Sequence, residues 1–564
     1  MEVLRGPTSV LYGQGDPGGS INLVLKRSRP ELGIGASATL DTTGTRLFEL
    51  DAGAPIDGER LSGRIVAQVE DSTTFRDFEK NRRLQVAPIV HAEPWNGFTV
   101  DALASFDRYD FTPVRDYLIF DTPYFSIDEL RRIPLSRNLS EPTLPLSRID
   151  TRIINISVEQ ALGGGWALGG TFYDYRADTS RYFELVAFER VPGTTTHNRI
   201  LRIGSRIRTN RTWAGHLRGA FTLLGSQHSL YTGIEHLEGA DNYFDAYYGP
   251  YLPIDTAAPI YQQTFIAPPL TTQRRGGQSS ATDAAYINDL IALGTRLKLQ
   301  LGLRYDPITT VATYGDPVRT HDTKLSPSAG IVWRPWEPTS LYASYSTAFV
   351  PQAGRTRLGD PLKPERSTAY EIGVKQELFG RRLAVTVAVF DITKAGVVQS
   401  DPADPGNSVL NGGAARSTGF ELEFDGRLPV EGLSIRGGVA YAHARIRRST
   451  DFTPGDVLVG PRPLTALLAL RQTLDAIGLR NAWASASLFY GGEAVVETPD
   501  DGQRLPAFTR IDLAAAKAIG PIEVQLNLKN LLNQRIFIGN GGGRVVFDNP
   551  RSFGVTARYR FGAR

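Results

Sequence analysis

Apolar and polar positions alternate strictly in several stretches of the chain. Within 551–561, polar or small residues alternate with apolar or aromatic ones at Phe553, Val555, Ala557, Tyr559 and Phe561. A period of two is that of a β-strand with one apolar and one polar face. The length of this segment also suits a tilted strand that crosses a bilayer. The same alternation occurs in 340–347, 369–375, 419–425 and 523–529.

The alternation predicts an all-β protein, and its extent favours one large antiparallel transmembrane β-barrel. A soluble β-sandwich alternates too, but its apolar faces have to fill one finite core, whereas this pattern continues through most of the chain. No stretch has a clear helical period. Closing the strands into a barrel removes both sheet edges, which a bilayer requires.

The expected connections between strands are of two kinds. The tight ones are 377–381, 429–432 and 518–521. The long ones, which are polar and aromatic, are 111–145, 239–277, 401–416, 450–463 and 538–550. Short turns at one end and long loops at the other are typical of an outer-membrane barrel.

Composition narrows the functional classes. The 564 residues are 41% hydrophobic with a mean hydropathy of −0.20, and no long apolar run predicts a transmembrane helix. The absence of cysteine excludes disulfides, thiolate metal sites and cysteine nucleophiles. The seven histidines are scattered without metal-ligand spacing, and no catalytic motif is evident, so we expect no enzyme. A net charge of +3 gives no reason to expect nucleic-acid binding.

The first 30 residues carry an ordered series of motifs. They are Arg5-Gly6-Pro7, Tyr12-Gly13, Pro17-Gly18-Gly19, Ile21-Asn22 and Lys26-Arg27. This series closely resembles the C-terminal end of the plug domain of TonB-dependent receptors. A phosphate-binding glycine loop is the poorer interpretation, because Pro17 and the following strand-like residues do not suit a helix. Glycines that supply positive φ in turns explain the pattern better.

Later segments are similar to the barrel of the same family. They are 362–365, 370–375, 419–423, 527–533 and the aromatic end at 559–561, after which Gly562, Ala563 and Arg564 depart from the family pattern. Three further segments, 228–233, 246–249 and 302–306, are most similar to ferric-hydroxamate receptors. The terminal aromatic strand resembles the signal that the barrel-assembly machinery reads.

The resemblance implies a barrel of 22 strands closed by a plug. We therefore expect a plug remnant at 1–29, the barrel at 30–561 and a short tail at 562–564. It also implies a monomeric receptor in the Gram-negative outer membrane, in contact with lipid and lipopolysaccharide. The expected ligand is a ferric siderophore of hydroxamate type, whose own groups hold the iron, so no cofactor or protein metal site is needed. Import would use energy from TonB, ExbB and ExbD.

Relative to the family, a signal peptide, a TonB box and most of a plug are missing before Glu2. Residues 1–26 lack the basic, apolar and small-residue regions of a signal peptide. We interpret the chain as N-terminally truncated, through either a misplaced start or a shortened gene. A shortened gene favours a different function, that of a passive open pore. Receptors of the same fold for cobalamin, haem or sugars are further alternatives, although 349–360 lacks the histidine usual in haem receptors.

Two groups of side chains are candidate functional residues. Arg5, Arg27, Glu371 and Glu421 match the types that form a charge cluster between plug and barrel in the family. The simpler explanation is that both glutamates face a wet lumen.

The second group is aromatic. Tyr243, Tyr247, Tyr248 and Tyr251 lie in an expected loop, and Tyr117 lies in another. Tyrosines can cover the apolar surface of a chelate while their hydroxyls bond its carbonyl groups. Resemblance to hydroxamate receptors supports Tyr247, Tyr248 and Tyr117 as ligand contacts. The alternative is an aromatic girdle at the membrane interface.

Overall fold

The protein is described from a computed structural model. The structure describes residues 2–113, 117–118, 125–262, 264–313, 317–404, 409–460, 462–496, 502–539 and 544–562. Neither of its two α-helices is long and apolar enough to span a bilayer.

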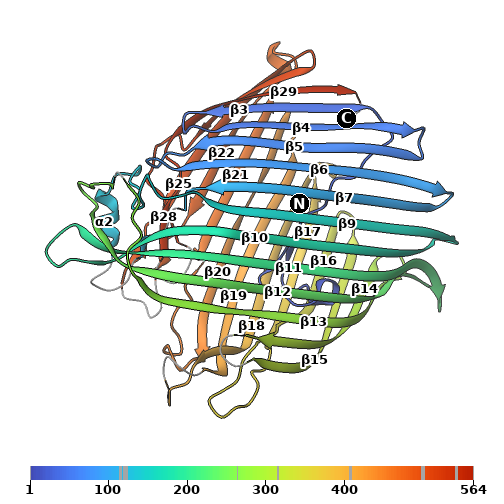
Figure 1. Cartoon of the computed structure of the whole chain (residues 1–564). Coiled ribbons are helices and arrows are strands. Elements are labelled where there is room, and N and C mark those ends of the chain that lie inside the picture. The colour runs from blue at the N-terminus through green and yellow to red at the C-terminus, as the bar shows by residue number, and fades with distance from the viewer. Residues whose placement is uncertain are drawn as a thin grey trace.

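Within these residues, 22 antiparallel strands form one closed barrel (Figure 1). Sequential strands pair with one another, and β29 closes the ring against β3. The first part of the wall is β3 (Gly33–Asp41), β4 (Arg46–Asp57), β5 (Leu61–Thr73), β6 (Lys80–Trp95), β7 (Phe98–Phe111), β9 (Ser147–Gly163), β10 (Trp166–Arg190), β11 (Thr196–Leu223), β12 (Ser226–Asp255), β13 (Leu270–Leu293) and β14 (Leu297–Ala312). The second part is β15 (Val318–Trp336), β16 (Thr339–Val350), β17 (Glu365–Leu378), β18 (Leu383–Ser400), β19 (Val409–Arg427), β20 (Leu433–Arg448), β21 (Leu464–Thr473), β22 (Ala482–Gly491), β25 (Phe508–Ile519), β26 (Ile522–Lys529) and β29 (Ser552–Gly562). The predicted fold is confirmed.

The five alternating segments all lie in barrel strands, namely β16, β17, β19, β26 and β29. Their apolar side chains point outward: Tyr370 and Ile372 are 58% and 63% exposed, while Glu371 between them faces the lumen. A bilayer rather than a protein core therefore covers the apolar face.

The two ends of the barrel differ as the connection lengths predict. All three predicted tight turns occur at one end, the short-turn end, whereas the long loops gather at the other, the long-loop end. One expectation is wrong: 239–277 is no loop over most of its length, because β12 continues to Asp255 and β13 begins at Leu270. Likewise, β19 begins at Val409, inside the expected loop 401–416. The ladder pairing of these extensions with their neighbours defines them as strands.

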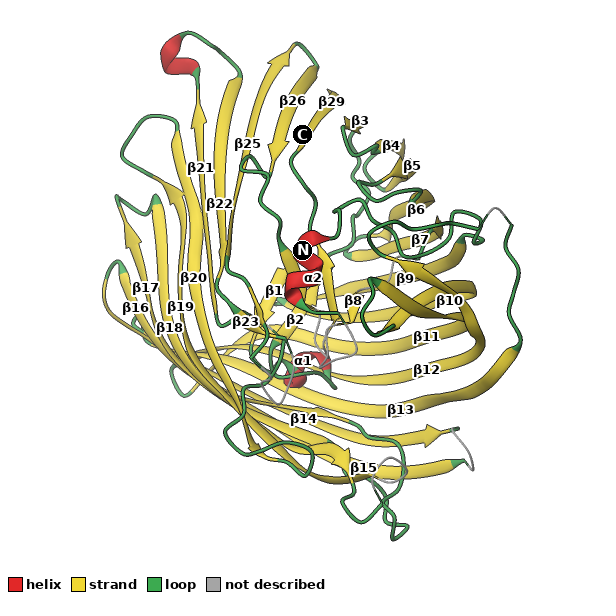
Figure 2. Ribbon diagram, turned by 90° about the vertical axis from the view of Figure 1, so that its left-hand side faces the viewer, coloured by secondary structure: helices red, strands yellow, loops and turns green. Residues whose placement is uncertain are grey.

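The N-terminal residues lie inside the barrel. β1 (Glu2–Arg5) and β2 (Gly19–Asn22) pair as a two-stranded sheet, and α1 (Ser9–Tyr12) lies against β13–β16 (Figure 2). The barrel wall then starts at Gly33 and ends at Gly562. We call residues 2–22 the lumen segment.

Three long loops meet at the long-loop end and pack together. They contain α2 (Ile127–Arg132), β8 (Tyr117–Leu118), β23 (Ala494–Val495), β24 (Arg504–Leu505), β27 (Phe537–Gly539) and β28 (Arg544–Phe547). β8 pairs with β28, and Phe125, Leu130, Leu505 and Val545 share one buried core. The loops leave the ring after β7, β22 and β26, and we call the packed part of them the outer bridge: residues 125–146, 494–496, 502–505, 535–539 and 544–547. A short 3-10 helix, η1 (Asp475–Ile477), lies at the short-turn end.

Candidate functional site

A cavity of about 770 Å³ lies on the inner wall near the outer bridge. We call it the wall cavity. Strands β6, β7 and β9–β13 contribute its lining, and the side chains that argue for function are arginines and tyrosines: Arg83, Arg202, Arg206, Arg208, Arg274, Tyr109, Tyr175, Tyr182, Tyr243 and Tyr247.

Carboxylates orient most of these arginines. Arg83 makes a bidentate contact with Asp107, at 2.8 and 2.9 Å. Arg202 pairs with Asp245 at 2.9 Å and with Glu184 at 3.4 Å. Since paired guanidinium groups lose rotamer freedom before any ligand arrives, such a wall presents its donors in fixed directions.

The tyrosines are ordered in the same way. The Tyr182 hydroxyl donates to Glu184 at 2.8 Å, and the guanidinium carbon of Arg202 lies 5.2 Å from the centre of the Tyr182 ring. Tyr243 and Tyr247 line the cavity from β12, each two residues away from Asp245 in the sequence. The cavity thus offers aromatic faces beside cationic donors, which suits a ligand with both apolar surface and oxygen acceptors.

The structure separates the predicted tyrosines into two groups. Tyr243 and Tyr247 face the wall cavity, whereas Tyr248 and Tyr251 pack with Leu201 in a second buried cluster, where Tyr251 is 5% exposed. Strand parity and a register shift between Tyr247 and Tyr248 explain the division. The backbone of Tyr117 pairs with Val545 in the outer bridge, but its side chain lies outside the described part of the structure.

The cavity arginines were not predicted from the sequence. Arg202, Gly204, Arg206 and Arg208 recur at a spacing of two, which is the signal of one strand face turned to a charged environment. Tyr175 and Tyr182 on β10 were missed as well, because their neighbours in the sequence give no sign of which face meets the lumen.

A buried ion pair holds the outer bridge to the same strands. Arg199 and Glu141 are both fully buried and their charged groups lie 2.6 Å apart. Arg199 also donates to the carbonyls of Leu252 (2.8 Å) and Leu139 (3.1 Å), while the second Glu141 oxygen accepts from the Gln262 backbone at 2.7 Å. Nearby, burial raises the pKa of the Tyr261 phenol, which donates to the Asn138 carbonyl.

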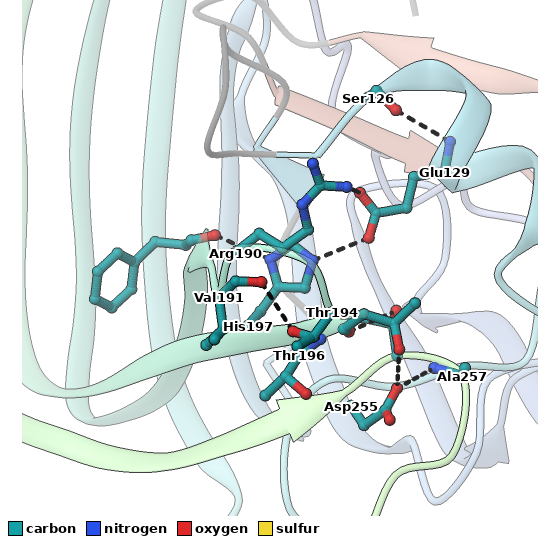
Figure 3. Close-up of polar contacts among 12 residues, drawn as sticks. Ser126, Glu129, Arg190, Val191, Thr194, Thr196, His197, Asp255 and Ala257 are labelled. Carbon is teal, nitrogen blue, oxygen red and sulfur yellow. Dashed lines mark hydrogen bonds and ion pairs between the residues drawn. The ribbon is translucent and has the colours of Figure 1, made fainter.

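His197 provides a second contact between the outer bridge and the barrel wall, drawn in Figure 3. Its Nε2 lies 3.0 Å from Glu129 of α2, and its Nδ1 lies 3.1 Å from the Phe188 carbonyl oxygen. Phe125 stacks on the imidazole with ring centres 3.8 Å apart, and Arg190 lies 3.6 Å from the other Glu129 oxygen. Both ring nitrogens of His197 thus face an oxygen atom, one on α2 and one on β10, so the side chain ties the outer bridge to the wall.

The predicted charge cluster is divided between two places. Arg5 pairs with Glu421 and Glu423, and Tyr342 donates to Glu371 at 2.6 Å beside them. Desolvation on burial lowers the pKa of the Arg5 guanidinium, but Glu421 and Glu423 together outweigh it, so this pKa lies above its ordinary value. Arg27, by contrast, lies 3.5 Å from Asp101 on another part of the wall.

Other contacts also hold the lumen segment to the wall. Lys394 pairs with Asp16 at 3.1 Å, and the Gly15 amide donates to the Phe349 carbonyl at 3.0 Å. A Cβ built on Gly13 would approach the Arg304 guanidinium to 3.1 Å. The described residues contain no group of three or more histidine or carboxylate side chains that could hold a metal ion.

A family model described as a TonB-dependent receptor-like β-barrel matches residues 94–531. The chain belongs to the TonB-dependent receptor family. Barrels of this family span the outer membrane of Gram-negative bacteria, which fixes its location. In such barrels the short turns lie on the periplasmic side and the long loops on the extracellular side, so the outer bridge faces the cell exterior.

Named relatives and solved structures agree with this assignment. The metal-pseudopaline receptor CntO of Pseudomonas aeruginosa UCBPP-PA14 is 28% identical over 95% of this chain and 76% of its own length. The ferrioxamine B receptor of Salmonella typhimurium SL1344 is 23% identical, with the same two shares covered. The crystal structure of the siderophore receptor PiuA from Acinetobacter baumannii superposes with a TM-score of 0.87 at 17% identity, over 99% of this chain and 86% of that one.

Proposed function

We propose that this receptor imports a ferric siderophore or a similar metal chelate, with energy delivered by TonB, ExbB and ExbD. The wall cavity is the observation that carries the proposal. It lies on β10–β12, the strands that also hold the outer bridge, and it turns tyrosines and arginines toward the lumen. Metal is already coordinated in such a ligand, so the protein has to recognise only the organic shell.

The type of chelate is a separate question. The sequence resemblance favours a hydroxamate, and a relative named for ferrioxamine B supports it. Relatives named for metal-pseudopaline and ferric pyoverdine match as well. The family alone therefore supports the broader class of metal chelates.

Uptake measurements test the proposal. In cells without another receptor for the same chelate, deletion of the gene should abolish uptake of radiolabelled iron supplied as the chelate, and removal of TonB should abolish it equally. Uptake that persists without TonB supports a passive pore instead. Uptake that persists after deletion of the gene contradicts both functions.

A pair of substitutions tests the site itself. We expect Tyr243→Ala with Tyr247→Ala to weaken chelate binding by roughly tenfold, since each aromatic contact contributes about 0.5–1.5 kcal/mol. Tyr370→Ala is the matched control, because Tyr370 is exposed on the outer face of the barrel. Equal binding by the double variant and the control in equilibrium titrations would remove the wall cavity from the ligand site.

A further inference from the structure

Arginines outnumber carboxylates in the described lining of the wall cavity. Five arginines and two aspartates line it. Two more carboxylates, Glu184 and Asp241, contact the lining arginines from outside it. Glu70 lies opposite Arg83 in the β5–β6 register and acts on it as well. The described carboxylates therefore equal the five guanidinium groups in number, but they gather around Arg83, Arg202 and Arg206 rather than around Arg208 and Arg274.

Carboxylates pair unevenly with these arginines. Arg274 on β13 is exposed, and within the described residues the structure shows no ion-pair partner for it. It lies opposite Asp245 in the β12–β13 register, but Asp245 is already paired with Arg202. Its guanidinium donors are therefore available to a ligand.

Arg208 adds donors from β11, which lies on the other side of β12 from β13. Asp241 binds Arg206 through two hydrogen bonds and contacts Arg208 through only one, at 3.2 Å. The side chain of Arg208 remains 52% exposed. A guanidinium has five N–H donors, so most of those on Arg208 are unused. Arg208 and Arg274 therefore both present unused guanidinium donors in the lining of the wall cavity.

Charge distinguishes the main classes of iron chelate. Three hydroxamate groups each carry one negative charge and together neutralise Fe³⁺, so their iron core presents little for a guanidinium to bind. A chelate built on carboxylates retains negative charge and outward-facing oxygens, which accept bidentate hydrogen bonds from arginine. The unused donors of Arg208 and Arg274 therefore match the second class.

We propose that the ligand is an anionic, carboxylate-bearing metal chelate and that Arg208 and Arg274 bind its carboxylates. This inference rests on the proposed function of the wall cavity as the chelate site. The ligand is then a chelate with net negative charge rather than the neutral hydroxamate chelate that the sequence resemblance favours.

The test compares two iron chelates and three variants. Ferric citrate is the anionic probe and ferrichrome the neutral tris-hydroxamate probe, each titrated against the purified protein. The variants are Arg208→Gln, Arg274→Gln and the control Arg108→Gln. Arg108 follows Asp107 in β7 and therefore faces the outside of the wall at the same height, where it pairs with Asp150.

We expect ferric citrate to bind at least tenfold more tightly than ferrichrome. Loss of either cavity arginine should weaken ferric citrate binding by about tenfold, as expected for one charge-assisted contact. The control should bind as the wild type does, and added salt should weaken binding of the anionic probe alone.

Two other outcomes have different meanings. If ferrichrome binds as tightly as ferric citrate and neither cavity variant changes this, the anionic class is wrong while the receptor function stands. If neither probe binds and gene deletion leaves uptake of both unchanged, the proposed function fails and the inference fails with it.

Discussion

The wall cavity and the outer bridge use the same chemistry in different surroundings. Both depend on arginine–carboxylate pairs carried by β11. In the cavity, Arg206 and Arg208 remain about half exposed around Asp241, whereas Arg199 and Glu141 in the bridge have no exposed surface. Exposed pairs contribute little to stability and leave donors for a ligand. A buried pair leaves none, and its two partners depend on each other.

The largest effect is therefore expected in the bridge. Arg199→Ala leaves Glu141 charged, buried and without its cation, which costs about 3–5 kcal/mol. We expect residues 125–146 to detach while the barrel stays closed. Hydrogen exchange and limited proteolysis of that loop measure the change.

A second variant separates charge from packing. Arg199→Met with Glu141→Leu replaces the pair by apolar side chains and should recover much of the lost protection. If the loop of the Arg199→Ala variant is as well protected as that of the wild type, the buried pair contributes no more to stability than the exposed pairs of the wall cavity do.

An intermediate effect is expected at His197. His197→Phe keeps an aromatic ring against Phe125 but removes the contacts to Glu129 and the Phe188 carbonyl. Loss of partners for these buried acceptors costs about 1–3 kcal/mol. Hydrogen exchange in α2 measures it, with His321→Gln as the control because His321 is exposed. Protection of α2 in His197→Phe equal to that in the control would show that ring stacking alone holds α2 to the barrel wall.

The smallest effect is expected at the lumen segment. Arg5 is 43% exposed and pairs with Glu421 and Glu423, so Arg5→Gln should cost less than about 1 kcal/mol. Lys394, the Gly15 amide and α1 continue to hold the segment. Proteolysis of the N-terminal residues should therefore accelerate only slightly, and their complete release would show that Arg5 is the main attachment.

The sequence predicted the membrane-spanning strands better than it predicted the extensions and functional side chains that these strands hold. Where lipid covers one face, as around Phe553 and Tyr370, apolar residues have to recur at every second position, and these strands were located correctly. The upper part of β12 was mistaken for a loop although it is a paired strand, because Gly249, Pro250 and Pro253 are residues typical of turns.

The candidate residues show the same limit. Tyr243 and Tyr248 have similar neighbours in the sequence, yet one faces the wall cavity and the other packs in a buried cluster. Five positions separate them, so alternation puts them on opposite faces, but this follows only once the segment is known to be a paired strand. Arg5 and Arg27 likewise match the family types, but their partners depend on the path of the chain through the lumen.

The outer bridge also has a consequence for the order of folding. Arg535 donates to the Leu130 carbonyl across 405 residues of sequence, and Val545 is buried in the same core as Phe125. Contacts between such distant residues form late, since the intervening chain has to be ordered first. We therefore expect the bridge to form late in barrel assembly, and pulse-labelling of its backbone amides measures when it does.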